Sequence, residues 1–510
     1  MRPYILPFLG FLPVVLTQCP DYTTYSNQSH EPLSSGRYKL SYQRPSPTCR
    51  TFNISDVETT IANVTSQITD PDLARLFENT WPNTLDTTVR WKGTANNSDE
   101  ELAFVITGDI DAMWLRDSAN QMQSYLALLK PSSDPNSLAS LYRGVINLQA
   151  RNIQTAPFCN SFQPPPESSL APASGSTAKV TPSYSPNQVF ECKYELDSLA
   201  AFLQISSEYY SATGDAAFFG KYSWLQAVQT VLNTANAMME STYNANGTIN
   251  EGPYNYIQSS TSGTETLTNS GYGNPVQNGT GLVRSVFRPS DDASIYQFLI
   301  PSNMQFSHFL STASTIAATL NTTDATALSK QMSDLSATIR AGISAYAIVH
   351  QNIPGGGQVY AYEVDGYGGT NIMDDANLPS LLAAPFIGYT NASDPIYVAT
   401  RALILSQRNP YWAAGPVIEA VGSPHVPFEQ VWPMSAIVRS LTSDDDDEIA
   451  AQIKMILSST NGLGLIHESI FTYDAARFSR PWFAWANGLF GQLIVELASS
   501  RPEVLKRSYQ

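Results

Sequence analysis

Charged side chains are scarce in this 510-residue chain, and basic ones are scarcer than acidic ones. Charged residues make up 14% of the total, and 44 acidic residues against 28 basic ones give a formal net charge of −16. A typical soluble domain is about 25% charged. Because nucleic-acid binding needs a basic surface, the balance argues against nucleic acid as a partner. With 26 tyrosines and many Ser, Thr and Asn, the composition is typical of a secreted, glycan-coated surface.

Cysteine and histidine are also few. The four cysteines form an even set, which in an oxidising compartment predicts two disulfides. Three pairings exist, and we favour Cys19–Cys49, which would tether the N-terminal tail, and Cys159–Cys192, which would close the intervening loop. No two cysteines have the spacing of metal ligands, and the five histidines are scattered along the chain. We therefore expect no metal site and no cofactor.

Long hydrophobic runs are missing. Residues 1–17 carry one early positive charge and a short apolar stretch broken by prolines, which is too brief to span a membrane. This pattern predicts a secretory signal peptide over 1–17. We expect a monomeric, soluble and secreted mature protein with no membrane partner. N-glycosylation is expected at eight N-x-Ser/Thr acceptors, namely Asn27, Asn53, Asn63, Asn96, Asn246, Asn278, Asn321 and Asn391.

Helical periodicity dominates the rest of the chain, and it predicts an all-α fold. About a dozen long helices without alternating strands indicate a closed barrel of helix hairpins. We expect an N-terminal extension with a first helix at 18–69 and one catalytic domain at 70–500. The expected helices are 55–67, 70–80, 114–129, 136–152, 194–212, 215–242, 294–319, 322–348, 375–385, 395–407, 433–441, 444–458 and 482–498.

Loop insertions interrupt this pattern. A proline- and serine-rich loop at 163–187 and a polar loop at 258–280 should be exposed, and the glycine-rich stretch 352–370 should form short hairpins at a barrel mouth. The sequence also predicts where two of the helices begin. Asp215 should cap the helix after Gly214, and Ser443 should open the acidic run that follows it.

The richest chemical segment is Gly-Asp-Ile-Asp-Ala-Met-Trp-Leu-Arg-Asp-Ser, from Gly108 to Ser118. A tryptophan beside carboxylates and an arginine suits a sugar, whose C–H face stacks on an aromatic ring while its hydroxyls bind charged groups. Asp109, Trp114, Arg116 and Asp117 are therefore candidate binding residues. The alternative is a helix start with acidic residues favoured by the dipole and a salt-bridged arginine.

Further segments mix aromatic residues with carboxylates at predicted loop-to-helix junctions. In a helical barrel such junctions would converge on one mouth, as in a glycosidase pocket. The alternatives are helix caps at 291–292 and 374–375, pairing of Glu195 and Asp197 with Lys193, and a core role for Trp485. The further candidate binding residues are Glu195, Asp197, Arg288, Asp375, Glu429, Trp432, His467, Trp485 and Asn487.

Hydrolysis of a glycosidic bond needs two carboxyl groups, a protonated one that donates to the leaving oxygen and an ionised one that activates water or attacks carbon. Asp291 and Asp292 are adjacent, so mutual repulsion should raise one pKa, while Arg288 would hold the other group ionised. Glu468 lies between a histidine and a serine that could orient it. Asp291, Asp292 and Glu468 are thus the candidate catalytic residues.

These segments resemble glycoside hydrolase family 125. The resemblance covers about 70–498 and rests on the Gly108 segment, Arg-Pro-Ser-Asp-Asp-Ala, Leu-Ile-Pro-Ser-Asn-Met, Met-Asp-Asp-Ala-Asn-Leu-Pro-Ser-Leu-Leu and the His-Glu-Ser segment. It implies an (α/α)6 barrel and a metal-independent exo-α-1,6-mannosidase that inverts configuration and acts on mannose-containing oligosaccharides or N-glycans. It also implies an aspartate acid, for which we slightly favour Asp291 over Asp292, and a glutamate base, which we place at Glu468.

Two other functions stay open at this point. One is a helical-barrel glycosidase for another sugar, such as glucose. The other is a secreted, catalytically inactive glycan-binding protein. The presence of both acid candidates and of Glu468 disfavours the inactive protein. Inversion further predicts that the two catalytic carboxyl groups lie roughly 6.5–9.5 Å apart, which leaves room for water.

Overall fold

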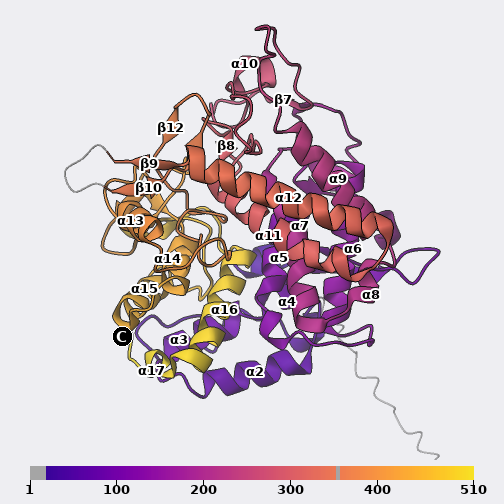
Figure 1. The fold of residues 1–510 in the computed structure, drawn as a ribbon. Helices are drawn as coiled ribbons and strands as arrows, with labels where there is room; N and C mark the ends of the chain where they lie inside the picture. The colour runs from indigo at the N-terminus through magenta and orange to yellow at the C-terminus, as the bar shows by residue number, and fades with distance from the viewer. Residues whose placement is uncertain (1–18, 352–356) are drawn as a thin grey trace, which may run out of the picture.

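The structure is a computed structural model that describes residues 19–351 and 357–510 (Figure 1). The predicted signal peptide and Gly355-Gly356 therefore lie outside the described residues. The helices are α1 (Tyr22–Tyr25), α2 (Ser55–Thr65), α3 (Pro71–Thr80), α4 (Asn83–Thr87), α5 (Leu115–Gln123), α6 (Leu138–Thr155), α7 (Leu196–Thr213), α8 (Ala216–Phe219), α9 (Trp224–Ala237), α10 (Thr268–Gly271), α11 (Ile300–Thr319), α12 (Thr323–Tyr346), α13 (Pro395–Ile404), α14 (Pro433–Leu441), α15 (Asp446–Ser458), α16 (Ala484–Ser500) and α17 (Pro502–Leu505).

Long helices that follow one another in the chain pack together, and the last long helix packs on the earliest ones. α5 packs on α7, α7 on α11, and α11 forms a hairpin with α12. Further along, α14 packs on α15 and on α16. Figure 1 shows the yellow α16 beside the purple α3, and α16 also packs on α5, so the last long helix contacts the earliest ones. Their buried apolar faces merge into one large core that runs through nearly the whole chain.

Short antiparallel strands supplement the helices, and an all-α description leaves them out. They form only two- and three-stranded sheets, in the orders β1-β2, β10-β9, β12-β11-β8, β13-β14, β15-β16-β17, β3-β4-β6 and β5-β7. Their bounds are β1 (Val89–Thr94), β2 (Glu101–Val105), β3 (Met113–Trp114), β4 (Ser161–Phe162), β5 (Lys179–Thr181), β6 (Val189–Glu191), β7 (Asn255–Ile257), β8 (Phe298–Leu299), β9 (Ile348–His350), β10 (Gln358–Tyr360), β11 (Glu363–Val364), β12 (Thr370–Asn371), β13 (Trp412–Ala414), β14 (Glu419–Val421), β15 (Gln430–Val431), β16 (Ile470–Phe471) and β17 (Asp474–Phe478).

These sheets matter because they hold the segments that precede helices. β3, which pairs with β4, ends at Trp114 immediately before α5, and β8 ends immediately before α11. β15 lies two residues before α14. The predicted hairpins around 352–370 are present as β9–β10 and β11–β12.

Side-chain caps explain several helix starts. Asp70 accepts hydrogen bonds from the backbone N–H groups of Asp72 and Leu73 at 3.0 and 3.1 Å, with Pro71 as the first helical residue. Proline suits that position because its missing N–H would have no partner there. The predicted cap at Asp215 is confirmed, since its carboxylate accepts from Phe218 N at 3.2 Å.

Three helix predictions were inaccurate. The expected helix at 215–242 is divided into α8 and α9. α15 is capped by Asp445 instead of opening at Ser443. No helix forms at 375–385, where the Asp374 carboxylate binds the N–H groups of Leu381 and Leu382 at 2.9 Å each. Prolines at 379 and 385 remove two backbone donors that a helix there would use.

The N-terminal segment is attached to the rest of the fold. Both predicted disulfides, Cys19–Cys49 and Cys159–Cys192, are present. Arg44 forms a buried ion pair with Asp86 at 2.7 Å. Asp70, which caps α3, also accepts from Tyr509 N at 2.7 Å, so it joins the first part of the chain to the last.

Within the described ranges, every helix is too short or too polar to cross a bilayer.

Candidate active site

One pocket collects residues from five distant parts of the chain. Seven of the predicted site residues line it, and the catalytic candidates Asp291 and Glu468 are among them; the others are Asp109, Trp114, Arg116, Asp117 and Trp432. Six lining residues were not predicted, namely Thr107, Ile110, Asn377, His425, Arg480 and Phe483. The segments that carry all of these residues do converge, as the mixture of aromatic residues and carboxylates indicated.

The Gly108 segment forms one wall because of its local backbone. Gly108 has a φ of +143° and lies flat on the Trp482 ring, where an added Cβ would come within 3.3 Å of the indole. Glycine tolerates this positive φ without the steric cost of a side chain. Trp114 then precedes α5, and its indole Nε1–H is buried with no partner among the described residues. An unpaired buried donor in the pocket wall is suited to a sugar hydroxyl.

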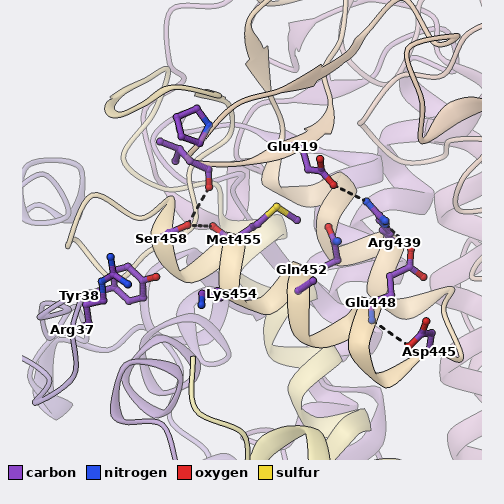
Figure 2. A pocket seen from close by; sticks show the side chains of 13 residues that line it. Arg37, Tyr38, Glu419, Arg439, Asp445, Glu448, Gln452, Lys454, Met455 and Ser458 are labelled. Atoms are coloured by element: carbon purple, nitrogen blue, oxygen red, sulfur yellow. Dashed lines mark hydrogen bonds and ion pairs between the residues drawn. The ribbon is translucent and has the colours of Figure 1, made fainter. Parts of the chain in front are cut away.

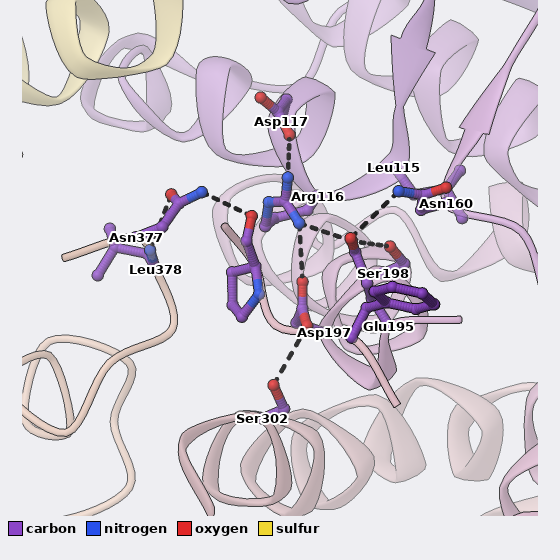
Figure 3. Close-up of polar contacts among 12 residues, drawn as sticks. Leu115, Arg116, Asp117, Asn160, Glu195, Asp197, Ser198, Ser302, Asn377 and Leu378 are labelled. Atoms are coloured by element: carbon purple, nitrogen blue, oxygen red, sulfur yellow. Dashed lines mark hydrogen bonds and ion pairs between the residues drawn. The ribbon is translucent and has the colours of Figure 1, made fainter. Parts of the chain in front are cut away.

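Arg116, which lines the pocket, is the centre of a buried cluster of carboxylates (Figure 3). Its guanidinium lies 2.6 Å from Glu195 Oε2, 3.0 Å from Asp117 Oδ2 and 3.3 Å from Asp197 Oδ2. Burial raises the pKa of Asp117 to about 6 and also raises the pKa values of Glu195 and Asp197. Ser302 donates to Asp197 at 3.2 Å.

Glu195 and Asp197 therefore do not line the pocket themselves. They lie behind Arg116 and hold its position. The alternative that they pair with Lys193 is wrong, because Lys193 contacts Glu191 at 3.3 Å instead.

Asp291 lines the pocket, whereas its neighbour Asp292 is not among the lining residues. Asp291 has a φ of +71°, a left-handed conformation that costs a non-glycine residue roughly 1–2 kcal/mol. Burial would raise the pKa of Asp291, but the charges of Lys193, Arg116 and His425 outweigh burial and hold it below its ordinary value. The expectation that the neighbouring carboxylate raises this pKa is wrong for the unliganded protein.

Asp292 is paired with a histidine that the sequence did not reveal. Its Oδ2 lies 3.3 Å from His425 Nδ1. Burial would lower the pKa of His425, but this contact and the charges of Asp291 and Glu468 raise it to about 9. The raised pKa favours the charged form of His425 at neutral pH, and His425 lines the pocket together with Asp291 and Glu468.

Glu468 is held at the pocket wall by two donors. Ser479 Oγ donates to Glu468 Oε2 at 2.9 Å, and Arg480 Nε donates to the same oxygen at 3.2 Å. Within the described residues, Oε1 accepts no hydrogen bond and is available to a ligand. Arg480 also pairs with Asp109, so it connects Glu468 to the Gly108 segment.

His467 has a structural position beside this base candidate. Its Nδ1 lies 2.8 Å from Pro481 O, and its ring stacks on Phe478 at 3.8 Å. Burial lowers the pKa of His467 to about 4, so the ring is neutral. It does not reach the pocket but fixes the backbone that carries Arg480.

Two other predicted residues make internal contacts instead of lining the pocket. Arg288 is buried and donates to Glu363 Oε1 at 2.7 Å. Asp375 accepts from the Ser290 hydroxyl, and burial raises its pKa to about 6. Both groups support the loop that presents Asp291, because Arg288 and Ser290 belong to that loop.

Three more predicted residues lie outside the pocket lining for different reasons. Trp485 is fully buried with the guanidinium of Arg116 6.0 Å from its ring, as its core alternative stated. Asn487 is also buried, and its side chain binds Ile466 N and O at 3.1 and 3.0 Å. Glu429 is exposed on the loop that carries His425.

A cavity much larger than this pocket lies elsewhere (Figure 2). It has a volume of about 790 Å³ and lies over α15 beside Tyr38. Its glutamates pair with Arg439, whose Nε lies 2.7 Å from Glu448 Oε1 and whose Nη1 lies 3.6 Å from Glu419 Oε1, and Asp445 caps α15. Size alone therefore does not identify the active site. Within the part of the chain that the structure describes, no group of three or more His, Cys, Asp and Glu residues could hold a metal ion.

Comparisons with known proteins agree with this geometry. The sequence model of the family described as metal-independent alpha-mannosidase, glycoside hydrolase family 125, matches residues 70–495. The chain belongs to this family. All of the residues that line the pocket fall inside the matched range.

Two relatives extend the family match. The "meiotically up-regulated gene 157 protein" of Schizosaccharomyces pombe is 44% identical over 506 residues, which are 99% of this chain and 97% of the relative. A metal-independent α-mannosidase of Streptococcus pneumoniae, solved in a non-productive complex with α-1,6-mannobiose, is 31% identical with a TM-score of 0.77. That match covers 88% of this chain and 100% of the solved one.

The fold also resembles that of a bacterial glucoamylase solved with acarbose. The TM-score is 0.51 at 10% identity, over 90% of this chain and 59% of the glucoamylase. At that identity the likeness concerns the fold alone. This member of family 125 thus has the helical architecture of barrel glycosidases.

Proposed function

We propose that this protein is an exo-acting α-mannosidase that removes non-reducing terminal α-1,6-linked mannose with inversion of configuration. The observation that carries the proposal is that Asp291 and Glu468, 177 residues apart in sequence, line the same pocket. Family membership and the α-1,6-mannobiose in the Streptococcus relative support the choice of sugar. The finer fold that accompanies this proposal is an (α/α)6 barrel.

Glu468 is the general base in this mechanism. Its Oε1 is free to take a proton from water, while Arg480 and Ser479 hold Oε2. The activated water attacks the anomeric carbon as the glycosidic bond breaks. Asp291 is the general acid and protonates the leaving oxygen.

The acid needs a proton, and the Arg116 cluster can supply it. Asp117, Glu195 and Asp197 share one guanidinium, and burial disfavours two uncompensated charges, so the cluster retains protons. Glu195, whose pKa is raised, is within hydrogen-bond reach of Asp291. In the unliganded protein the proton stays on Glu195, because its pKa is the higher of the two. In this proposal a bound sugar removes water from the pocket and raises the pKa of Asp291, so that the proton moves from Glu195 to Asp291 before the glycosidic bond breaks.

We assign sugar binding to aromatic and carboxylate side chains that line the pocket together with Asp291 and Glu468. The Trp114 ring, which packs against Phe190 at 5.4 Å, provides an apolar face, and Asp109 and Asp117 accept hydrogen bonds from hydroxyls. Trp432 contributes a second ring with an unpaired Nε1–H among the described residues.

A direct assay tests the reaction and the sugar. Purified protein is given α-1,6-, α-1,3- and α-1,2-linked mannobiose and an α-glucoside, and NMR follows the first-formed anomer. We expect hydrolysis of the α-1,6 linkage, with β-mannose released first, and no turnover by Glu468→Gln. Release of α-mannose first would refute inversion. Preference for the glucoside would favour the other-sugar alternative, and mannose binding without turnover would favour the inactive binder.

We also propose that the protein is secreted, N-glycosylated and monomeric. All eight predicted acceptor asparagines are exposed, which leaves them open to glycan attachment. A shift in electrophoretic mobility after enzymatic deglycosylation of protein secreted by a eukaryotic host tests glycosylation. Size-exclusion chromatography with light scattering tests the monomer.

A further inference from the structure

A second cavity, of about 650 Å³, adjoins the catalytic pocket. We call it the outer cavity. Asp109 lines both spaces, and its neighbours are divided between them, since Thr107 lines the catalytic pocket and Gly108 the outer cavity. Likewise, Phe483 lines the catalytic pocket and Trp482 lines the outer cavity. The volume falls within the roughly 300–1,000 Å³ that is usual for ligand sites.

The N-terminal segment builds one wall of the outer cavity. Cys19 and Cys49, joined by a disulfide, both line it. Tyr22 lies edge-on to Trp482 at 5.0 Å, and its hydroxyl accepts from Asn83 Nδ2 at 3.1 Å. This wall precedes residue 70, where the family match begins, so the match assigns it no role.

The polar groups of the outer cavity suit a neutral, hydroxyl-rich ligand. Arg90 and Asp111 lie 3.2 Å apart with 50% and 45% of their side chains exposed, so donors and acceptors are presented together. Such a pair matches adjacent hydroxyl groups of a sugar. Asp21, Asp86 and Asp109 add further carboxylates to the lining. Asp86 and Asp109 are paired with Arg44 and Arg480, yet a lining with four aspartates and a single arginine still disfavours a phosphate or an acidic peptide.

We propose that the outer cavity binds the leaving-group side of an oligosaccharide, from the second sugar beyond the cleaved bond onward. The inference rests on the proposed α-mannosidase function. The terminal mannose occupies the pocket between Asp291 and Glu468, and the rest of the glycan must leave at the rim. Asp109 is the rim residue shared with the outer cavity, so the glycan continues there. Longer saccharides are therefore better substrates than disaccharides.

Steady-state kinetics on two substrate lengths tests this site. The wild type and Arg90→Ala are compared on α-1,6-mannobiose and on a linear α-1,6-mannotetraose. Arg90→Ala should lower kcat/KM for the tetraose about tenfold, mainly through KM, because a charge-assisted hydrogen bond is lost. Its kcat/KM for the disaccharide should stay within about twofold of the wild type. Arg507→Ala, which removes an exposed arginine paired with Asp447 at 2.6 Å, is the matched control and should change neither value.

A second variant tests the wall itself. The double change Cys19→Ser and Cys49→Ser frees the segment that carries Asp21, and it should produce the same selective loss on the tetraose. Equal effects on both substrates in Arg90→Ala, or no effect on the tetraose, would overturn the inference while leaving the α-mannosidase intact. A wild type inactive on both mannosides would instead overturn the proposed function, and this inference with it.

Discussion

Replacing Arg116 with methionine should destabilise the protein much more at neutral pH than in mild acid. The guanidinium is 3% exposed and contacts Glu195, Asp117 and Asp197. Without it, three buried carboxyl groups have no cation beside them. They must then fold in the protonated form, and their pKa values in the folded state rise further above those in the unfolded chain.

The magnitude follows from the pKa of Asp117 and from the buried pairs. Raising a carboxyl pKa from 3.8 to about 6 costs about 3 kcal/mol at pH 7 even in the wild type. Removing one partner of a buried ion pair costs about 3–5 kcal/mol, which is the loss we expect for Arg116→Met at pH 7. Between the unfolded and the folded pKa values, the folded state binds more protons than the unfolded chain, so stability falls as pH rises. At pH 4.5 most of the difference in proton binding between the folded state and the unfolded chain vanishes. The loss of unfolding free energy caused by Arg116→Met should therefore shrink to about 1–2 kcal/mol.

Urea unfolding followed by tryptophan fluorescence at pH 7 and pH 4.5 measures both values. Arg507→Met is the control, because solvent screens its exposed ion pair and its loss should change the free energy of unfolding little at either pH. A loss for Arg116→Met that is the same at the two pH values would refute the reasoning. The lost packing of the side chain, and not the uncompensated carboxyl groups, would then explain the effect.

Three further predictions concern activity on α-1,6-mannobiose. Asp291→Asn should lower kcat at least about 10³-fold, whereas Asp292→Asn should lower it only about tenfold by loosening His425; equal losses would contradict the assignment of the acid. Arg480→Ala should lower kcat/KM about 10- to 100-fold because Glu468 loses a donor that positions it, and a rate equal to the wild type would show that Ser479 suffices. Dialysis against EDTA should leave kcat/KM unchanged, while a loss that calcium or zinc reverses would show a metal in the mechanism.

The sequence predicted the helices and the pocket wall better than the individual roles of the side chains. Apolar periodicity is set by burial, so it located most long helices, and Trp114, Arg116 and Asp117 lie in the pocket as expected. The same periodicity does not tell which face of a helix lines a cavity. Asn487 was therefore predicted to bind substrate, although it binds the backbone of Ile466.

Other features depend on contacts that are distant in sequence. Arg480 joins Glu468 to Asp109, which lies 371 residues away, and no local pattern reports such a pair. His425 stands alone in a proline-containing loop without any periodicity. The pKa of Asp291 was predicted from its neighbour Asp292, but cations from other segments decide its direction.

Asp70 has a consequence for how the protein is made. One carboxylate oxygen caps α3, and the other accepts from Tyr509 near the C-terminal end, while α16 packs on α3 and α5. During synthesis the faces of α3 and α5 that pack on α16 stay uncovered until the ribosome has released α16. We therefore expect the nascent chain to stay open and dependent on chaperones until a late, cooperative closure. A ribosome-bound chain ending before α16 should be sensitive to protease throughout.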